Sequence, residues 1–550
     1  MTALFNFIKW IGYSIKASNM KKLPRNLRLE AGNARRQFLK LAGYGTLGLV
    51  AGGVWPLLGQ SAAGQHEDAI SKTGFVPDLD ISLVAKPGNL AIFPGPATQI
   101  WQYHATVNKG DKNRVVELPR SYLGPVIKAQ QGEKIRIRFT NSIPEESIVH
   151  WHGLHVPEAM DGHPRYVIPQ GQSYLYEFEV KNRAGTYWYH PHPHGRTGPQ
   201  VYGGLAGLFL VSDDEEQAVG LPDGEYDVPL VIQDRTFDRD NQLVYTSGNR
   251  MERMTGFLGN LILVNGKPDF TLPVSTTVYR FRLLNGSNSR IYKLAWQDGR
   301  PLTIIGTDGG LLEKPVQRQY VFLAPGERIE LWADFSGSPV GYRTNIISLP
   351  FDGGGMGRGM MMNRRTGTTQ NLPLGTRFSV FKIKVTKQIE KKVSLPQKLS
   401  EINPVQRNEI DNFSRPKQFY LTMGHMQWAI NGRTFQMEDV ADDEIVQLGS
   451  REIWEFNNTG GGMMRMMNMP HPIHLHGKQF KVIGRSGVDH QGYVDEGWKD
   501  TVLLMPGERI RILVDFDDYP GLFLYHCHNL EHEDMGMMRN YFVRETNIGI

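Results

Sequence analysis

Cysteine is nearly absent from this chain of 550 residues, in which Cys527 is the one thiol. A single cysteine excludes any internal disulfide, so an exported protein would keep the thiol for another reason, such as metal ligation. Cys527 stands between two histidines in the stretch LYHCHNLEHEDMGMM, residues 524–538. The first question that the sequence raises is therefore which chemistry needs a thiol at this place.

An excess of charge of one sign is also lacking, and long helical periodicities are scarce beyond the N-terminus. The 61 basic and 56 acidic residues leave a formal net charge of +5, with many of the cations before residue 41, so the balance does not predict nucleic-acid binding. The 60 glycines and 32 prolines mark frequent turns instead. These features favour an all-β protein, and the length predicts about three domains.

The N-terminal stretch NARRQFLKLAGYGTLGLVAGG, residues 33–53, places a twin arginine before a moderately apolar, glycine-rich run. It resembles a twin-arginine export signal, with Ala34 where serine or threonine is usual. The alternative is an N-terminal anchor, which is disfavoured because glycines and a proline make a poor membrane-spanning helix. We expect residues 1–63 to be a leader that the twin-arginine export machinery directs to the periplasm, with either Met1 or Met20 as its start.

Segments with the period-two alternation of half-buried strands repeat along the chain. Three of them end in asparagine, namely IRIRFTN (135–141), YRFRLLN (279–285) and REIWEFN (451–457). A second repeat joins PGERIELWADF, residues 325–335, to PGERIRILVDF, residues 506–516. The pattern indicates one β-domain written three times. We expect domains at residues 64–215, 222–387 and 418–550, with a polar linker at 388–417.

Histidine is missing from the middle of the chain, with none between His194 and His425. On either side it gathers in four motifs, HWHG (150–153), WYHPHPHG (188–195), HPIHLHG (471–477) and HCHNLEHEDMGM (526–537). Residues i and i+2 of a strand share one face, so each H-x-H pair presents two imidazoles side by side. Imidazole suits copper, zinc, iron and nickel, so histidine alone does not identify the metal.

The cysteine favours copper. Period two sends Cys527 to one face of a strand and His526 and His528 to the other, so one short segment can touch two metal centres. A blue copper site uses two histidines, one cysteine and a weak thioether, and the candidates are His471, Cys527, His532 and Met537. The other motif histidines, half from each outer domain, can bind three coppers where these domains meet: His150, His152, His190, His192, His474, His476, His526 and His528.

Each of these residues alone has a more ordinary explanation. A lone histidine is more often a structural hydrogen-bonding residue than a ligand, and a lone methionine usually packs in a core. Four H-x-H pairs, with the sole cysteine inside one of them, outweigh that explanation. Two groups stay outside the ligand set: Met535 and Met538 as packing residues, and His155, His163 and His194 as neighbours of the site or surface residues.

All four motifs resemble those of the multicopper oxidases, the family of laccases, ascorbate oxidase, bilirubin oxidase and the bacterial copper-efflux oxidases. The likeness covers nearly the whole chain after the leader, and it implies three cupredoxin domains, which are Greek-key β-sandwiches. It also implies four copper ions. The type 1 copper would be bound by His471, Cys527, His532 and axial Met537, and the type 2 copper by His150 and His474. The type 3 pair would be bound by His152, His190, His192, His476, His526 and His528.

The resemblance implies a reaction as well. A reducing substrate would lose single electrons at the type 1 copper, Cys527 and its flanking histidines would pass them on, and O2 would be reduced to water at the other three coppers. That reduction consumes protons, and Asp161 and Glu533 resemble the acidic proton relay of the family. As isolated acids, both would be solvated surface residues.

Methionine gives the best indication of the electron donor. Five methionines lie in GGMMRMMNMP, residues 461–470, and four more in GGGMGRGMMMN, residues 353–363. Thioethers favour Cu(I), so one candidate donor is Cu(I) itself, in a copper-tolerance role. The alternative donor is a phenol or an aromatic amine, with methionine as adaptable apolar packing and the glycine-rich tract as a mobile loop.

Two other classes of protein are disfavoured. Noncatalytic scaffolds of the same fold, which serve in cell division, lose the copper ligands, whereas this chain has every ligand residue. Two-domain nitrite reductases lack the third domain. We expect a monomer whose partners are O2 and a small donor and which binds no nucleic acid.

Overall fold

The computed structural model describes residues 74–246, 250–353, 372–391, 393–424, 427–459, 469–487 and 491–545. Contacts divide the chain into residues 1–64 and a unit of residues 65–550, and the strands listed below all belong to the second unit. The expected leader, residues 1–63, and most of the two methionine-rich stretches lie outside the described residues. Within the described part, no helix is long and apolar enough to cross a membrane.

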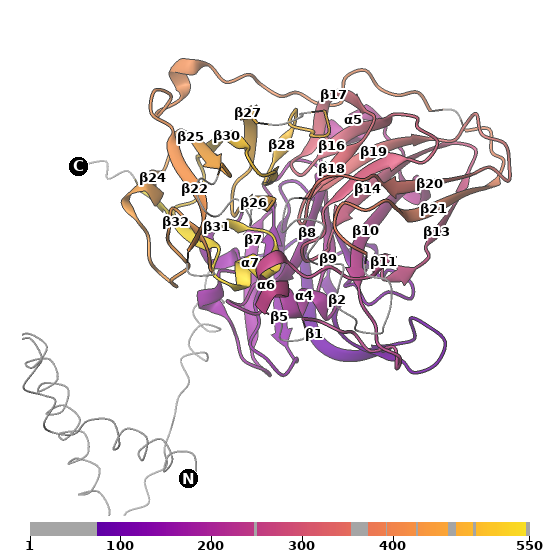
Figure 1. The fold of residues 1–550 in the computed structure, drawn as a ribbon, viewed down its shortest axis with the longest axis horizontal. Helices are drawn as coiled ribbons and strands as arrows, with labels where there is room; N and C mark the ends of the chain where they lie inside the picture. The colour runs from indigo at the N-terminus through magenta and orange to yellow at the C-terminus, as the bar shows by residue number, and fades with distance from the viewer. Residues whose placement is uncertain are drawn as a thin grey trace, which may run out of the picture. The chain divides into compact units, whose positions relative to one another are not determined.

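Strands dominate the unit, and its described residues form six sheets, two in each third of it (Figure 1). In the first third, residues 79–212, the sheet orders are β2-β1-β5-β7 and β3-β4-β9-β8-β6. The strands are β1 (Leu79–Leu90), β2 (Thr98–Lys109), β3 (Val115–Val116), β4 (Val126–Gln130), β5 (Lys134–Asn141), β6 (Val149–His152), β7 (Ser173–Glu179), β8 (Gly185–Pro191) and β9 (Gly207–Ser212). We call this pair of sheets the first sandwich.

The middle sandwich, residues 227–387, has the sheet orders β12-β11-β10-β14-β19-β16-β17 and β13-β21-β20-β15-β18. Its strands are β10 (Asp227–Arg235), β11 (Leu261–Val264), β12 (Lys267–Pro268), β13 (Thr271–Ser275), β14 (Val278–Asn285), β15 (Tyr292–Trp296), β16 (Leu302–Thr307), β17 (Gly310–Arg318), β18 (Val321–Leu323), β19 (Arg328–Asp334), β20 (Arg343–Ser348) and β21 (Phe378–Lys387).

The third sandwich, residues 417–544, has the sheet orders β23-β22-β25-β30-β27-β28 and β24-β32-β31-β26-β29. Its strands are β22 (Lys417–Gly424), β23 (Gln427–Ile430), β24 (Ile445–Gln447), β25 (Ser450–Asn457), β26 (His471–Leu475), β27 (Phe480–Ser486), β28 (Trp498–Lys499), β29 (Thr501–Leu504), β30 (Arg509–Phe516), β31 (Gly521–Cys527) and β32 (Met538–Arg544).

Helices in the described residues are few and short. The α-helices are α4 (Thr197–Tyr202), α5 (Asp214–Val219), α6 (Arg250–Thr255) and α7 (Leu530–Asp534). The 3-10 helices are η2 (Lys112–Arg114), η3 (Glu158–Met160), η4 (Pro164–Tyr166), η5 (Gly224–Tyr226), η6 (Arg407–Glu409) and η7 (Asp442–Glu444). Helix α7 contacts both α4 and α6, so the three meet near the centre of the view in Figure 1.

The sequence repeats occupy equivalent places in the three sandwiches. The asparagine-ending segments form β5, β14 and β25, and each pairs in parallel with the opening strand of its sandwich, which is β1, β10 or β22. On its other side each pairs antiparallel with β7, β19 or β30, and the last two of these carry the PGER repeat. The prediction of an all-β fold built from three consecutive sandwiches is confirmed; its residue boundaries stay a prediction.

The terminal asparagine of each repeat is buried, and in the first two repeats its side chain bonds backbone groups of segments that follow. Nδ2 of Asn141 donates to the carbonyl oxygen of Ile168 at 2.9 Å, and Nδ2 of Asn285 donates to that of Leu323 at 2.8 Å. An amide at this place satisfies backbone groups that the sheet leaves without partners.

Two repeats depart from the expected half-buried pattern, since in β25 every residue from Glu452 to Asn457 is buried as well. Every residue of β14 is buried, because its polar face packs inside the unit. There Arg280 and Arg282 form ion pairs with Glu330 at 2.5 Å and 3.0 Å. Glu330 also accepts a hydrogen bond from Thr186 of the first sandwich at 2.7 Å, so this polar face joins two sandwiches.

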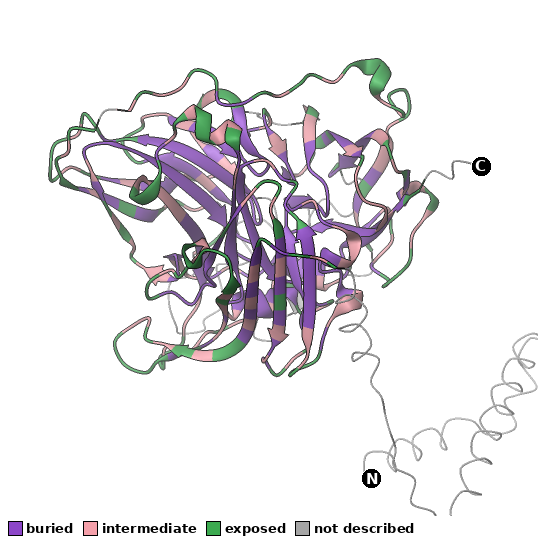
Figure 2. Cartoon of the chain, turned by 180° about the vertical axis from the view of Figure 1, so that it is seen from behind, coloured by how far each residue is buried: buried purple, intermediate pink, exposed green. Residues whose placement is uncertain are grey.

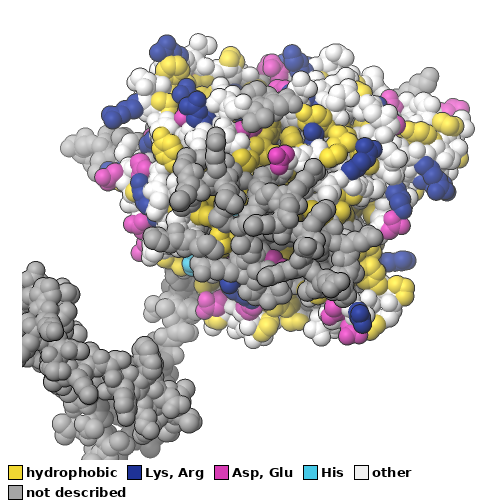
Figure 3. Space-filling view, in the orientation of Figure 1, with side chains coloured by type: hydrophobic (Ala, Val, Ile, Leu, Met, Phe, Trp, Pro, Cys, Tyr) yellow, Lys and Arg dark blue, Asp and Glu magenta, His cyan; other side chains and the backbone are white. Residues whose placement is uncertain are grey.

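Each sandwich has its own apolar core, which contains Trp151 in the first, Phe281 in the middle and Trp454 in the third. Figure 2 shows buried strands inside and exposed residues mainly in loops and short helices. On the face drawn in Figure 3, basic and acidic side chains are interspersed and hardly any histidine shows among the described residues. The histidines predicted as ligands are all buried.

Candidate metal centre

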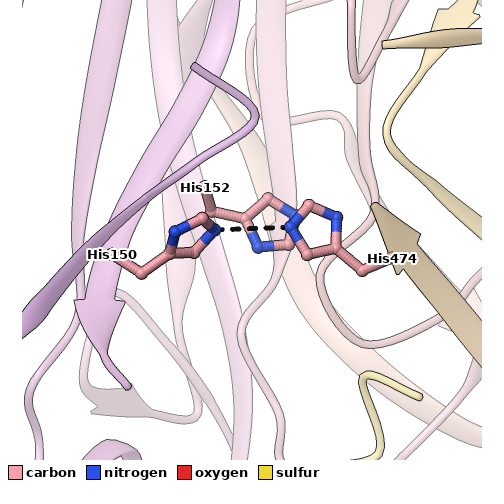
Figure 4. Close-up of side chains that lie close together, drawn as sticks. All are labelled: His150, His152 and His474. Carbon is pink, nitrogen blue, oxygen red and sulfur yellow. Dashed lines mark hydrogen bonds between the residues drawn. The ribbon is translucent and has the colours of Figure 1, made fainter. Parts of the chain in front are cut away.

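Two pairs of antiparallel strands hold the eight histidines of the H-x-H motifs, five within the strands and His192, His476 and His528 at the residue after a strand ends. In the first sandwich β6 pairs with β8, so that His150 lies opposite His190. In the third sandwich β26 pairs with β31, so that His474 lies opposite His526. All eight side chains are buried. Figure 4 shows the rings of His150 and His152 meeting that of His474 where the two sandwiches face each other.

The eight histidines form two triads and one pair. The first triad is His152, His190 and His528, and the second is His192, His476 and His526. Within each triad the candidate ligand atoms lie within 4.8 Å of one another. The pair is His150 and His474, whose Nε2 atoms lie 3.3 Å apart. Each group contains residues of both outer sandwiches, so folding of the whole unit is needed to assemble it.

Backbone carbonyls fix the tautomers of the pair. Nδ1 of His150 lies 2.7 Å from the carbonyl oxygen of Asp161, and Nδ1 of His474 lies 2.8 Å from that of Asp500. A carbonyl oxygen only accepts hydrogen bonds, so each Nδ1 carries the hydrogen and each Nε2 carries a lone pair alone. The two lone pairs face each other at 3.3 Å without a hydrogen between them.

The same arrangement recurs in the second triad. Nδ1 of His476 donates to a carboxylate oxygen of Asp161 at 2.8 Å, and Nδ1 of His526 donates to the carbonyl oxygen of Cys527 at 3.2 Å. The Nε2 atoms of His476 and His526 then face each other at 3.0 Å. Lone pairs that converge in this way repel unless a cation lies between them. The donor set therefore fits metal ions that imidazole nitrogen binds, copper among them.

Burial also keeps these imidazoles in the form that binds metal. It lowers the pKa of His190 to about 3 and that of His526 to about 4. The pKa values of the other six histidines lie well below the usual range, because of burial first and of neighbouring imidazoles second. Arg328 lowers the pKa of His152 and His474 further. Since the neutral ring is the ligand, no proton has to leave before a metal binds at neutral pH.

A separate cluster surrounds Cys527 in the third sandwich, and we call it the sulfur cluster. The Sγ atom of Cys527 lies 3.4 Å from Nδ1 of His471 and 3.6 Å from Nδ1 of His532. Burial raises the pKa of the thiol, so a thiolate at this place requires a cation beside it. Met537 is buried in the same core, and its carbonyl oxygen accepts a hydrogen bond from the Cys527 amide at 3.0 Å.

Adjacent residues of β31 reach different groups, as period two predicts. Sγ of Cys527 lies next to His471, whereas Nε2 of His526 lies 3.4 Å from Nε2 of His192 in the first sandwich. His528, on the other side of Cys527, joins the first triad. Each histidine triad therefore contains a residue that is joined to Cys527 by a single peptide bond.

The segment before the middle sandwich's β11 covers the sulfur cluster. Nε2 of His532 donates to the carbonyl oxygen of Met254 in α6 at 2.9 Å, and the same oxygen accepts a hydrogen bond from the Trp428 indole at 2.9 Å. The Trp428 ring lies 4.7 Å from the ring of His471 and 5.0 Å from that of His532. Because Nε2 of His532 carries the hydrogen, the lone pair of its Nδ1 atom is available on the side of the ring that faces Sγ of Cys527.

Comparisons with known proteins agree with this geometry. Family models described as multicopper oxidase match residues 99–216 and 411–547, which hold all four histidine motifs. A laccase of Bacillus stratosphericus is 32% identical to this chain, over 81% of it and 90% of the laccase. The solved structure of McoA multicopper oxidase from Aquifex aeolicus is 36% identical, with a TM-score of 0.70 over 86% of this chain and 97% of that one. The chain belongs to the multicopper oxidase family.

This multicopper oxidase is thus a copper-dependent enzyme that couples the oxidation of a reducing substrate to the reduction of O2. Its three sandwiches are cupredoxin-like. A further relative is the cell division protein FtsP of Photorhabdus laumondii, which is 31% identical over 92% of this chain and 97% of that protein.

Both predicted relay acids lie against histidines of the oxidase. Asp161 is buried, accepts from His476, and leaves its Oδ1 atom without a hydrogen-bond partner among the described residues. Glu533 places Oε1 at 3.4 Å from Nε2 of His192 and Oε2 at 3.2 Å from Nδ1 of His526. Burial raises the pKa of both carboxyl groups well above the usual range. Neither is the solvated surface acid that it would be in isolation.

Asp500 and Arg328 belong to the site although the sequence did not predict them. Oδ1 of Asp500 lies 3.1 Å from Nε2 of His152, and Arg328 of the middle sandwich grips both carboxylate oxygens of Asp500 at 2.7 Å and 2.5 Å. The ring of His152 thus turns its Nδ1 atom, which has no hydrogen-bond partner in the described part of the chain, toward the first triad. Arg328 does lie in the PGER repeat, but the repeat predicts a strand and no partner for it.

Three histidines outside the ligand set lie apart from the triads. Nε2 of His163 is 3.0 Å from Oδ1 of Asn540 in the third sandwich, and Nδ1 of His155 is 3.5 Å from Asp518. His194 is exposed and its ring lies 4.8 Å from that of Phe435. The structure brings the predicted ligand residues together in the two triads, the pair and the sulfur cluster; their division among copper ions stays a prediction.

Proposed function

We propose that this oxidase holds four coppers. His471, Cys527 and His532, with Met537 as a weaker ligand, would hold the type 1 copper, and His150 and His474 would hold the type 2 copper. The triads would hold the type 3 pair, with His152, His190 and His528 on one copper and His192, His476 and His526 on the other. When bound, these coppers would supply one-electron oxidation of the donor and four-electron reduction of O2 to water.

The observation that carries this proposal is the placement of three consecutive residues, the last two of β31 and the one that follows it. Cys527 lies with His471 and His532, while His526 and His528 lie in the two triads. A thiolate and its neighbouring imidazoles thus connect the two centres through a few covalent bonds. Backbone carbonyls hold the rings of His150, His474 and His526 in one tautomer before any metal binds, which reduces the reorganisation that ligation requires.

Protons for O2 reduction would pass through Asp161 and Glu533. Each carboxyl group lies against an imidazole of the second triad, and each has a raised pKa because burial favours its neutral form. A carboxyl group that is neutral near working pH can donate a proton and be reprotonated. The two acids approach the triad from different segments, so they would serve separate steps or separate protons.

For the donor, we propose a phenol or aromatic amine, as in laccases, or Cu(I). The laccase relative supports the first, and the methionine content of residues 353–363 and 461–470 supports the second. Met469, the one methionine of those stretches that the structure describes, is buried in the core of the third sandwich. It therefore packs, and does not by itself favour Cu(I).

The same proposal includes export and assembly. The twin-arginine stretch at residues 33–53 would direct the chain to the periplasm as a monomer. A scaffold role in cell division is the second candidate, because FtsP is similar over nearly its whole length. The complete ligand set favours the oxidase over the scaffold, since a scaffold needs neither the thiol nor the converging lone pairs.

The first test replaces Cys527 by serine in the copper-loaded enzyme. We expect the blue absorbance to disappear and donor-driven O2 uptake to fall to that of a protein-free control, because serine oxygen does not replace the thiolate. The histidine triads should keep their copper, so copper analysis should show the loss of one ion per chain. Blue colour and O2 uptake that both survive the substitution would refute the proposed wiring.

A further inference from the structure

A cavity of about 490 Å³ lies on the first sandwich, beside the segment that leads into α6. Its walls come from β1, β2, α4 and residues 243–245, and they include Trp101, Tyr202 and Tyr245. Tyr202 is buried, whereas Trp101 and Tyr245 are half-buried and present ring surface to the cavity. The proposed copper centres do not use any of these residues.

The aromatic floor of this cavity is rigid. The rings of Tyr202 and Tyr245 lie 4.6 Å apart, and each contacts Phe257, at 5.1 Å and 5.3 Å. Behind Tyr202 the buried Arg235 guanidinium lies 4.5 Å from the ring centroid. The Tyr202 hydroxyl accepts from the Thr236 amide at 2.7 Å and donates to the carbonyl oxygen of Val244 at 2.8 Å. A ring that enters the cavity thus meets surfaces that do not have to rearrange.

Tyr245 connects the cavity to the sulfur cluster. Its hydroxyl donates to Oε1 of Glu531 at 2.7 Å, and Glu531 immediately precedes His532 in α7. Three other groups hold the Glu531 carboxylate, namely the Phe257 amide at 3.0 Å, Asn288 at 3.0 Å and the Ser289 hydroxyl. A short hydrogen-bonded and covalent path therefore runs from the cavity floor to a proposed type 1 ligand.

Direct contact between a donor ring and the sulfur cluster is blocked by described residues. Nε2 of His532 already donates to the Met254 carbonyl oxygen, and the Trp428 ring lies against the His471 ring. All four of these residues are buried. An aromatic donor must then pass its electron through protein atoms, and the cavity offers a place from which it can do so.

The lining also selects between the two donor classes. Among the described residues that line the cavity there is no charged side chain, thioether, thiol or imidazole, and the polar side chains besides the tyrosines are Asn89 and Gln99. Cu(I) prefers sulfur and imidazole ligands, so this cavity does not suit it. Aromatic walls with a few amides suit a neutral aromatic ring that carries hydroxyl or amino groups. A second cavity, of about 540 Å³, is lined by Glu455, Arg509 and several polar residues and lacks this character.

We propose that the cavity of Trp101 and Tyr245 binds the neutral phenol or aromatic amine that this oxidase consumes, and that Tyr245 and Glu531 form the route by which its electron reaches His532. The inference rests on the proposed function. In each step one phenol would lose an electron to the oxidised, copper-loaded enzyme through His532 and the proton of its hydroxyl to water at the cavity mouth, leaving a phenoxyl radical. Four such steps supply the electrons for one O2.

The test uses the copper-loaded enzyme with 2,6-dimethoxyphenol and with Cu(I) as separate donors. Trp101→Leu should raise the KM for the phenol about 10-fold, because it removes a stacking surface, and leave Cu(I) turnover unchanged. Tyr245→Phe keeps the ring but removes the bond to Glu531, so it should lower kcat for the phenol with little change in KM. Tyr420→Leu, in the second cavity, is the matched control and should change neither.

A binding measurement separates this proposal from the oxidase function itself. Calorimetry with methoxybenzene, which has the ring but no oxidisable hydroxyl, should show binding to the wild type and about 10-fold weaker binding to Trp101→Leu. If Trp101→Leu has the same KM and the same methoxybenzene affinity as the wild type, the cavity proposal is overturned and the proposed oxidase function still holds. A wild-type enzyme that consumes no O2 with either donor would overturn the proposed function instead.

Discussion

At the scale of single residues, Asp161 shows how one residue serves two histidines. Its backbone carbonyl oxygen accepts from His150 and its carboxylate accepts from His476, so it fixes the tautomers of a residue of the pair and a residue of the second triad. Its Oδ1 atom lies 3.6 Å from Nδ1 of His150. The carbonyl contact survives any substitution of the side chain, whereas the carboxylate contact does not.

Replacement of Asp161 by asparagine should therefore separate the two roles. The backbone contact to His150 would remain, and an amide oxygen could still accept from His476, but the group could no longer donate or take up a proton. We expect O2 reduction to slow about 10- to 100-fold, with the blue absorbance retained. Stopped-flow reoxidation of the reduced enzyme measures the step. Wild-type activity with an unchanged pH profile would exclude a relay role for Asp161.

At the scale of elements, the middle sandwich contributes to the centre although it supplies none of the predicted ligands. Arg328 is the first residue of β19 and is fully buried, and its guanidinium donates to the Asp500 carboxylate. Asp500 directly precedes β29 of the third sandwich and contacts His152 of the first. One ion pair thus joins elements of all three sandwiches at the first triad. The nearby Lys499 pairs with Asp308 at 3.0 Å and extends the same charged layer.

Arg328→Met should destabilise the enzyme strongly, because it leaves Asp500 buried without its cation. Loss of one partner from a buried pair typically costs about 3–5 kcal/mol. Copper retention should fall as well, since Asp500 would no longer hold His152 in one orientation. Urea unfolding and copper analysis after dialysis measure the two effects. The double variant Arg328→Met with Asp500→Asn should regain part of the lost stability. If Arg328→Met alone unfolds like the wild type and retains its copper, the ion pair does not have this role.

Much of the fold and the site could be predicted from sequence, and the exceptions have a common physical cause. The ligands repeat as H-x-H because a strand presents alternate residues to one face, so His150 and His152 can be recognised by spacing alone. Arg328 and Asp500 lie 172 positions apart, and only the packing of separate sandwiches brings them together. The Met254 carbonyl oxygen has no side-chain signal at all. Likewise the burial of β14 depends on the partner sandwich that covers its arginines.

At the scale of the whole molecule, the proposed coppers would act as links between the outer sandwiches. Each triad and the pair take residues from both, so bound metal would stabilise only the assembled unit. A ligand that binds the folded state alone stabilises it by about 2.7 kcal/mol when its free concentration is 100 times Kd. Without metal, the converging lone pairs and the buried neutral imidazoles would oppose the same arrangement.

Removal of copper by a chelator should consequently lower the unfolding temperature of this oxidase, and readdition should restore it. Differential scanning calorimetry measures the change. Cys527→Ser provides the control. This variant should lose only the part of the copper-dependent rise in unfolding temperature that comes from the sulfur cluster, and it should keep the larger part that comes from the triads. Equal unfolding temperatures with and without copper would mean that the metals do not hold the sandwiches together.

A crystal structure of the copper-loaded enzyme, with anomalous diffraction recorded at the copper edge, would show whether the two outer sandwiches together build an oxygen-reducing copper cluster. We predict four peaks: one beside Cys527, one between His150 and His474, and one in each histidine triad. A single peak at Cys527, or peaks away from these residues, would contradict that arrangement.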